Sequence, residues 1–191
     1  MPERERGLSS IRRPTREELL EAVGRKMPDL IAPGLKVLFC GINPSVYSAV
    51  VGHHFARPGN RFWPALHASG FTSRLLAPRE QGELLTLGYG ITNVVERASV
   101  SADVLTAEEL AGGGRQLEAK VRRYRPRCLA VLGISAWRTA FGRPRAVMGP
   151  QPESLGGVRV WVLPNPSGLN AHYTPRDLAR LFRELRLAVA D

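Results

Sequence analysis

Two short segments of this chain each combine an asparagine with a following proline, and they lie far apart in the sequence. The segments are 41–45 (Gly-Ile-Asn-Pro-Ser) and 165–169 (Asn-Pro-Ser-Gly-Leu), and each follows an apolar run typical of a buried strand. Neither segment contains a carboxylate, a lysine or a cysteine. Chemistry at these positions would depend on positioned polar groups and backbone amides, because neither a strong base nor a covalent nucleophile is present.

The hydrophobic pattern predicts a scaffold that brings the two segments together. Apolar runs at residues 37–40, 89–95, 128–133 and 158–163 are typical of strands. Helices are expected after Thr15, at 61–66, after Pro78, at 106–124, at 135–141 and at 174–189, whereas residues 45–60 are expected to be irregular. This alternation predicts an α/β fold, a three-layer α/β/α sandwich around a mostly parallel four-stranded sheet.

Three asparagines fall where such a fold would place a ligand. Asn43, Asn93 and Asn165 each lie at or just after the end of a predicted strand. Parallel sheets bind ligands beyond the carboxyl ends of their strands, so we expect the three amides to converge at one rim. Each position alone is ambiguous, because Asn-Pro is an ordinary turn dipeptide and Asn93 is equally consistent with a strand-end cap.

The charge of the chain indicates the kind of partner it binds. The formal net charge is +10, and the 27 basic residues include three lysines, which leaves 24 arginines. Arginine and lysine bind polyanions by displacing counterions from phosphates, so the charge favours a polyanionic partner. A preference of the source genome for arginine would give the same composition.

Several side chains that often do chemistry are given no role. Cys40 and Cys128 fall inside apolar runs, which indicates buried thiols in a reducing compartment and gives no support for zinc or iron–sulfur binding. His53 and His54 are adjacent in a loop without a third ligand nearby, so we expect them to be solvated or to face phosphate. Neither a metal nor a cofactor is expected.

The domain organisation follows from composition. No apolar run approaches the ~20 residues that a membrane span requires, and residues 1–6 lack the apolar centre of a secretory signal. We therefore expect a soluble, cytoplasmic protein. Residues 1–28 are predicted to form a polar, basic arm with a short helix, and residues 29–191 a single domain that acts as a monomer.

Two apolar residues are conspicuous because they occur in otherwise polar loops. Phe55 is either a loop anchor in the core or a platform that stacks on a planar ligand. Leu169, between Gly168 and Asn170, is either a cover for the core or a wedge that enters a base stack. In the second case Gly168 would let the backbone approach nucleic acid closely.

Three separated motifs, taken together, resemble the mismatch-specific uracil-DNA glycosylases, the bacterial relatives of thymine-DNA glycosylase. They are Gly-Ile-Asn-Pro at 41–44, Phe-Ala-Arg-Pro-Gly-Asn-Arg-Phe-Trp at 55–63 and Asn-Pro-Ser-Gly-Leu at 165–169. The resemblance runs from about Leu30 to Leu187 and leaves the arm outside. It implies the uracil-DNA glycosylase fold and a monofunctional enzyme of base excision repair, whose partner is double-stranded DNA with a G:U mismatch or a damaged base.

The resemblance also implies roles for individual residues. Asn43 matches the residue that orients the attacking water, Phe55 the residue that stacks on the flipped base, and Asn93 is a candidate second water-positioning amide. The other residues implied in substrate binding are Ile42, Ser45, Tyr47, Ser48 and Asn165, and those implied in DNA binding are Ser167, Gly168, Leu169 and Asn170.

The chain departs from the family pattern at three places. Ser45 stands where a glycine is common, Tyr47 adds bulk to the same loop, and Ala171 stands where an arginine often follows the wedge. The alternative hypothesis is a non-catalytic DNA-binding protein that recognises mismatches or damage on the same scaffold. A nucleotide-binding enzyme has less support, because no G-x-G-x-x-G or Walker-type loop follows the first predicted strand.

Overall fold

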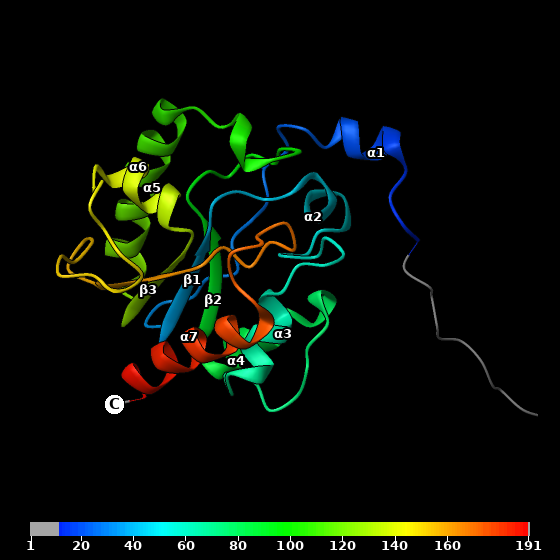
Figure 1. The fold of residues 1–191 in the computed structure, drawn as a ribbon. Helices are drawn as coiled ribbons and strands as arrows, with labels where there is room; N and C mark the ends of the chain where they lie inside the picture. The colour runs from blue at the N-terminus through cyan, green and yellow to red at the C-terminus, as the bar shows by residue number, and fades with distance from the viewer. Residues whose placement is uncertain (1–11, 191) are drawn as a thin grey trace, which may run out of the picture.

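The computed structural model describes residues 12–190 and contains a five-stranded sheet with helices on both faces (Figure 1). The strands are β1 (Val37–Gly41), β2 (Tyr89–Asn93), β3 (Cys128–Leu132), β4 (Gly149–Pro150) and β5 (Arg159–Leu163), in the spatial order β2-β1-β3-β5-β4. Strands β2, β1, β3 and β5 are parallel, and β4 pairs antiparallel with β5 at the edge. The predicted α/β sandwich with a mostly parallel sheet is confirmed.

The predicted strand number was wrong because it omitted β4. This strand has two residues, which pair with Val162 and Trp161 of β5. Two residues cannot display an alternating pattern, and proline is depleted from strands except at edges, so the sequence carries no recognisable strand signal there.

The helices agree with the predicted positions except in the segment after β1. They are α1 (Arg16–Glu21), α2 (Val46–Val51), α3 (Phe62–Ala68), α4 (Glu83–Leu87), α5 (Ala107–Tyr124), α6 (Ile134–Phe141) and α7 (Pro175–Ala188), with single 3-10 turns η1 (Pro78–Glu80) and η2 (Ala102–Val104). Capping boxes begin α1, α5 and α7. The expectation that residues 45–60 are irregular was wrong for α2, which begins where Ser45 caps the backbone N–H of Ser48.

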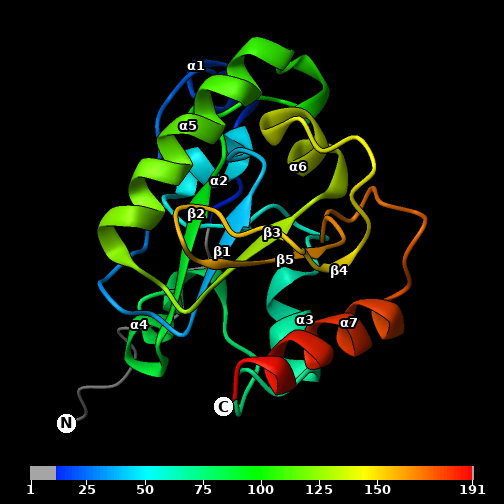
Figure 2. The ribbon, with the colours of Figure 1, turned by 90° about the vertical axis from the view of Figure 1, so that its left-hand side faces the viewer.

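Alternate residues of the strands face two separate apolar layers. Phe39 of β1 packs with Phe62 of α3 and Phe182 of α7 on one face of the sheet. Leu38 and Cys40 of the same strand pack on the other face. Helices α5 and α6 cover that second face (Figure 2). Cys40 and Cys128 are free and buried in these layers, which confirms the expectation of buried thiols.

The described part of the arm contacts the domain through a third, smaller cluster. Ala22 and Met27 are buried against Val46 and Ala49 of α2 and against Ala98. Residues 1–11 of the predicted arm lie outside the described residues, and the boundary at residue 28 stays a prediction. In the part of the chain that the structure describes, no helix has the length and apolar content needed to cross a membrane.

Candidate active site

The carboxyl ends of the parallel strands enclose a small pocket of ≈ 120 Å³. It brings together the segments after β1 and β5, as expected from the position of both at strand ends. Of the residues predicted from the sequence, those in its lining are Ile42, Asn43, Ser45, Ser48, Phe55, Asn93, Asn165 and Ser167. Four others, Tyr47, Gly168, Leu169 and Asn170, are outside the lining.

The hydrogen bonds of Asn43 leave its amide oxygen available. Asn43 Nδ2 donates to the carbonyl of Arg97 at 3.1 Å and to Ser99 Oγ at 2.7 Å. Ser99 Oγ in turn donates to the carbonyl of Ser101 at 2.6 Å, so it acts as an acceptor toward Asn43. None of the described residues donates to Asn43 Oδ1, which therefore offers the pocket an acceptor for a water molecule.

One partner of Asn43, Arg97, is itself held by an ion pair. Arg97 Nε and Nη2 bond to the carboxylate of Glu109 at 2.5 and 3.0 Å, in the first turn of α5. The Arg97 guanidinium lowers the pKa of Glu109 to about 2, with a further contribution from the backbone N–H of Thr106. Arg97 and Ser99 were not predicted as site residues, because their role depends on contacts with Asn43, which is more than fifty residues away.

Asn165 presents the opposite polarity to the pocket. Its Oδ1 accepts from the backbone N–H of Ser167 at 2.9 Å, and its carbonyl accepts from Asn170 Nδ2 at 3.0 Å. Within residues 12–190, no group accepts a hydrogen bond from Asn165 Nδ2. The pocket thus has a free acceptor on Asn43 and free donors on Asn165.

Asn93 lies against the floor of the pocket, at the end of β2. It is 6% exposed, and its side chain forms no hydrogen bond with the described residues. A Cβ atom at Gly41 would lie 2.5 Å from Asn93 Oδ1 and 3.3 Å from the Phe55 ring. The absence of a side chain at Gly41 therefore leaves the space between these two groups open.

Phe55 contacts both the core and the pocket, so its part in anchoring the loop is confirmed and its stacking on a ligand stays a prediction. Its ring stacks on Phe62 in the core, with centroids 4.2 Å apart and an interplanar angle of 29°, and it also lines the pocket. Its φ of 53° is unusual for a bulky residue. Such strain persists where the surroundings fix it, and here Ser48 Oγ accepts from the N–H of Ala56 at 3.1 Å.

His54 anchors the other side of Phe55, and the expectation that it is solvated was wrong. It is 3% exposed. Its Nε2 donates to the carbonyl of Pro28 at 3.0 Å, its backbone N–H donates to Gln81 Oε1 at 2.8 Å, and its carbonyl accepts from Trp63 Nε1 at 3.1 Å. These partners lie 9, 26 and 27 residues away along the chain, so the spacing of residues in the sequence could not reveal them.

Acidification should destabilise the protein through His54. Burial lowers the pKa of His54 below its ordinary value of 6.5, so below that pH the unfolded chain binds more protons than the folded one. Stability is therefore lost as the pH falls from 6.5 through the lowered pKa. Thermal melts between about pH 5 and 8 should show a steeper loss of Tm for the wild type than for His54→Gln, which retains a donor for Pro28. Equal slopes would contradict this.

A single arginine fixes the loop that follows β5. Arg61 Nη1 donates to the carbonyl of Tyr173 at 2.6 Å, and Nη2 donates to the carbonyls of Ser167 and Asn170, both at 2.8 Å. Its backbone N–H donates to the carbonyl of Pro166 at 2.9 Å. Arg61 belongs to the motif at 55–63, but the sequence did not predict that it holds a segment more than a hundred residues away.

The clamped loop presents Leu169 to solvent beside the pocket. Leu169 is 78% exposed, which excludes the alternative that it covers the core. A Cβ atom at Gly168 would lie 2.5 Å from the carbonyl oxygen of Gly59, so glycine is required there by the neighbouring loop. Arg57, also exposed, lines the mouth of the pocket and was not predicted as a site residue.

The pocket has no charged nucleophile among the described residues. No carboxylate, lysine or cysteine lines it. Lys120 lies 2.5 Å from Asp29 Oδ2 and donates to Thr92 Oγ1 at 3.0 Å, away from the pocket. Within residues 12–190, no cluster of three metal-binding side chains occurs. The polar side chains of the lining are those of asparagines, serines, His54 and Arg57.

Comparison with known proteins identifies the family. A model of the uracil DNA glycosylase superfamily matches residues 28–186. The chain belongs to this superfamily. Members are DNA glycosylases of base excision repair, so the activity is hydrolysis of a base–sugar bond and the substrate is DNA. The resemblance drawn from the three motifs is thereby confirmed at the level of the superfamily.

A solved structure with the same fold supports the assignment of architecture. The solution NMR structure of a protein from Methanosarcina acetivorans, named as a candidate uracil DNA glycosylase, aligns with a TM-score of 0.56 and 21% identity. The alignment covers 86% of this chain and 99% of that one. At 21% identity, this similarity shows that the two proteins share a fold and nothing more.

Proposed function

We propose that this protein removes uracil, and other damaged pyrimidines, from mismatches with guanine in double-stranded DNA, acting as a monomer. A base in a duplex cannot reach a pocket of this kind, so the target nucleotide must be flipped out of the stack. The bond between the base and deoxyribose is then hydrolysed by one positioned water.

The observation that carries this proposal is the opposite polarity of the two amides in the pocket. Asn43 has a free oxygen, which suits a water molecule, and Asn165 has free N–H donors, which suit a carbonyl oxygen of a pyrimidine. Phe55 supplies a flat ring on which the base can stack. A protein that only bound DNA would have no need to keep a water acceptor beside the sugar.

The reaction follows from these groups. Cleavage builds positive charge on the sugar and negative charge on the departing base, and donors such as those of Asn165 stabilise the latter. The water on Asn43 Oδ1 adds its oxygen to the sugar carbon and releases a proton to solvent, because an amide cannot accept it. Without a general base, we expect slow turnover.

The DNA-facing groups lie around the pocket mouth. In this proposal Leu169 fills the space that the flipped base leaves, and Arg57 contacts a neighbouring phosphate. Both side chains are exposed, which supports these roles. Specificity for guanine on the opposite strand would come from the loop of Ser167 to Asn170 that carries Leu169, since this loop adjoins the pocket and is held rigidly by Arg61.

The proposal is tested with a labelled duplex that contains one G:U pair. After incubation with the full chain, alkali should break the strand at the uracil, and A:U or undamaged G:C duplexes of the same sequence should be cleaved far less. Cleavage equal to that of a blank would leave the alternative of a non-catalytic mismatch-binding protein. Equal cleavage of G:U and A:U would remove the mismatch specificity but keep the activity.

Replacing Leu169 with alanine should impair cleavage of duplex DNA selectively. The wedge acts only where a base stack has to be refilled, so we expect about a tenfold loss on G:U duplex and little change on single-stranded uracil DNA. The matched control is Leu187→Ala, which truncates another exposed leucine, in α7. An equal loss on both substrates would contradict the role of Leu169 as a wedge.

A further inference from the structure

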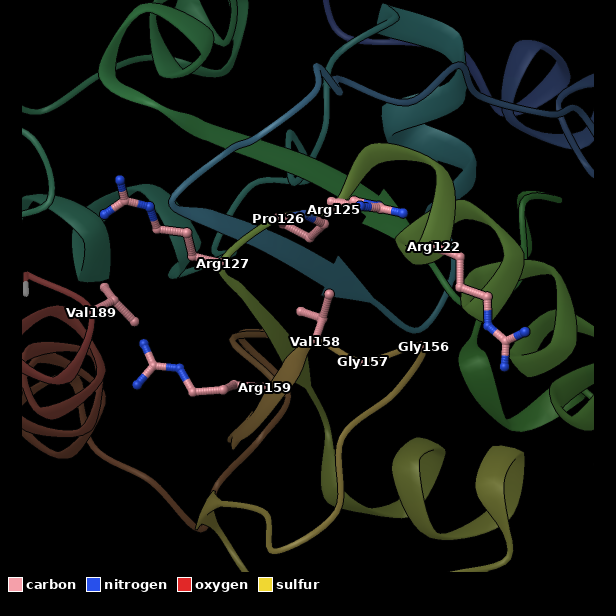
Figure 3. A pocket seen from close by; sticks show the side chains of 9 residues that line it. All are labelled: Arg122, Arg125, Pro126, Arg127, Gly156, Gly157, Val158, Arg159 and Val189. Atoms are coloured by element: carbon pink, nitrogen blue, oxygen red, sulfur yellow. The ribbon is translucent and has the colours of Figure 1, made fainter.

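A strongly basic hollow lies away from the active site and has no part in the proposed reaction. Its volume is ≈ 1020 Å³, and its side chains include four arginines, Arg122, Arg125, Arg127 and Arg159 (Figure 3). Arg122 is in the last turn of α5 and Arg125 is its C-cap, whereas Arg127 directly precedes β3 and Arg159 begins β5. All four are exposed.

These arginines are mostly without carboxylate partners. Arg122 pairs with Glu118 at 2.6 Å, but within residues 12–190 Arg125, Arg127 and Arg159 form no salt bridge. Figure 3 shows the side chains of Arg127 and Arg159 extending in the same direction, on either side of Val189, from the starts of the neighbouring strands β3 and β5. Their positive charges therefore add to one another in a concave surface whose lining contains no carboxylate.

Fold stability alone does not account for this cluster. Basic residues near a helix C-terminus interact favourably with the helix dipole. This explains Arg122 in α5 and contributes at Arg159, whose Nη2 donates to the carbonyl of Ala188 at 3.4 Å, at the end of α7. It does not explain Arg127. Arg125 has φ 47°, the left-handed conformation that glycine usually provides at such a cap. An arginine in that conformation strains the backbone, and such strain is typical of residues whose side chain has a function.

The position of the hollow excludes its use in gripping the DNA at the active site. Arg127 and Arg159 lie at the amino ends of parallel strands, and the pocket of Asn43 lies at their carboxyl ends. Five residues of strand separate the two rims by about 15 Å, and the rims face away from each other. One straight duplex seated over the pocket would not reach the arginines.

We propose that this hollow binds the phosphodiester backbone of a second DNA segment, so that one molecule holds two segments at once. Arginine forks match phosphate oxygens, and the lining offers no aromatic ring for a base and no deep apolar cavity for a peptide anchor. Contact is with the backbone and is independent of base sequence. The inference goes beyond the cleavage reaction and does not require it.

A bridging experiment with the full chain tests this inference. One uracil-free duplex is fixed to beads, a second fluorescent duplex of unrelated sequence is added, and the label retained by the protein is measured at low salt. Wild type should retain the label, and Arg127→Glu/Arg159→Glu should retain about tenfold less, because two phosphate contacts become repulsive. Arg115→Glu/Arg145→Glu, the same charge change at exposed arginines outside the hollow, should bridge like the wild type.

Two further measurements separate this result from other causes. Thermal melts should show that Arg127→Glu/Arg159→Glu is folded at the assay temperature, with a Tm lowered slightly by the loss of the hydrogen bond from Arg159 to Ala188. Its cleavage of a short G:U duplex should equal that of the wild type. Bridging is measured without cleavage, so a failure of the proposed glycosylase reaction would leave the bridging result readable. Unchanged bridging by this variant would overturn the inference. A second result would also overturn it: the wild type fails to bridge the duplexes but binds a polyglutamate peptide, and Arg127→Glu/Arg159→Glu does not bind that peptide. The hollow would then be a site for an acidic protein segment.

Discussion

Replacing Asn43 with alanine should lower cleavage of a G:U duplex by about 10³-fold while the affinity for that duplex changes little. The variant removes the oxygen that we propose holds the attacking water. A 10³-fold loss of rate corresponds to a loss of about 4 kcal/mol in transition-state stabilisation. The donors of Asn165 and the ring of Phe55, which bind the base, are left in place. Single-turnover cleavage and fluorescence anisotropy measure the two quantities separately.

Asn60→Ala is the matched control for this variant. Asn60 also lines the pocket, but its Oδ1 accepts from the N–H of Phe62 at 2.9 Å, at the start of α3. Its loss should cost about 1 kcal/mol of stability and less than tenfold in cleavage. If Asn43→Ala cleaved at the rate of the wild type, the water would have to be held elsewhere, and Asn93 would be the first residue to test.

Replacing Arg61 with lysine should leave the loop that carries Leu169 without a fixed conformation, although the positive charge is kept. The guanidinium serves three carbonyls at once, those of Tyr173, Ser167 and Asn170, and an ammonium on a flexible stem cannot reproduce that planar fork. Hydrogen bonds to charged groups contribute about 1.5–3 kcal/mol each, so losing one or two should lower the Tm by several degrees. Duplex cleavage should fall by about 10- to 100-fold.

The substrate dependence distinguishes this effect from general destabilisation. Arg61 acts through the wedge loop, so below the melting temperature its loss should affect duplex DNA more than single-stranded uracil DNA. Arg57→Lys changes an exposed arginine of the same motif that forms no salt bridge within residues 12–190, and we expect it to melt like the wild type. A uniform loss on both DNA forms by Arg61→Lys would argue against a positioning role.

The sequence determined the features of this protein that depend on neighbouring residues. Capping boxes fix where α1 and α5 begin, because Thr15 and Thr106 each meet a glutamate three residues later. The apolar runs fix the four parallel strands, and strand polarity alone then places Asn43, Asn93 and Asn165 at one rim. The family motifs lie in the loops at that rim, which is why the superfamily could be recognised before the fold was known.

The tertiary structure decided what each of these groups is free to do. Asn43 has a free oxygen only because Arg97 and Ser99, 54 and 56 residues further along, take up its donors. His54 is buried, and Arg61 clamps a distant loop, through partners that no local pattern reveals. The arginines of the second hollow likewise meet only because β3 and β5 are neighbours in the sheet. Local sequence fixes backbone conformation, whereas the unused hydrogen-bonding capacity of a side chain is set by whatever the fold packs around it.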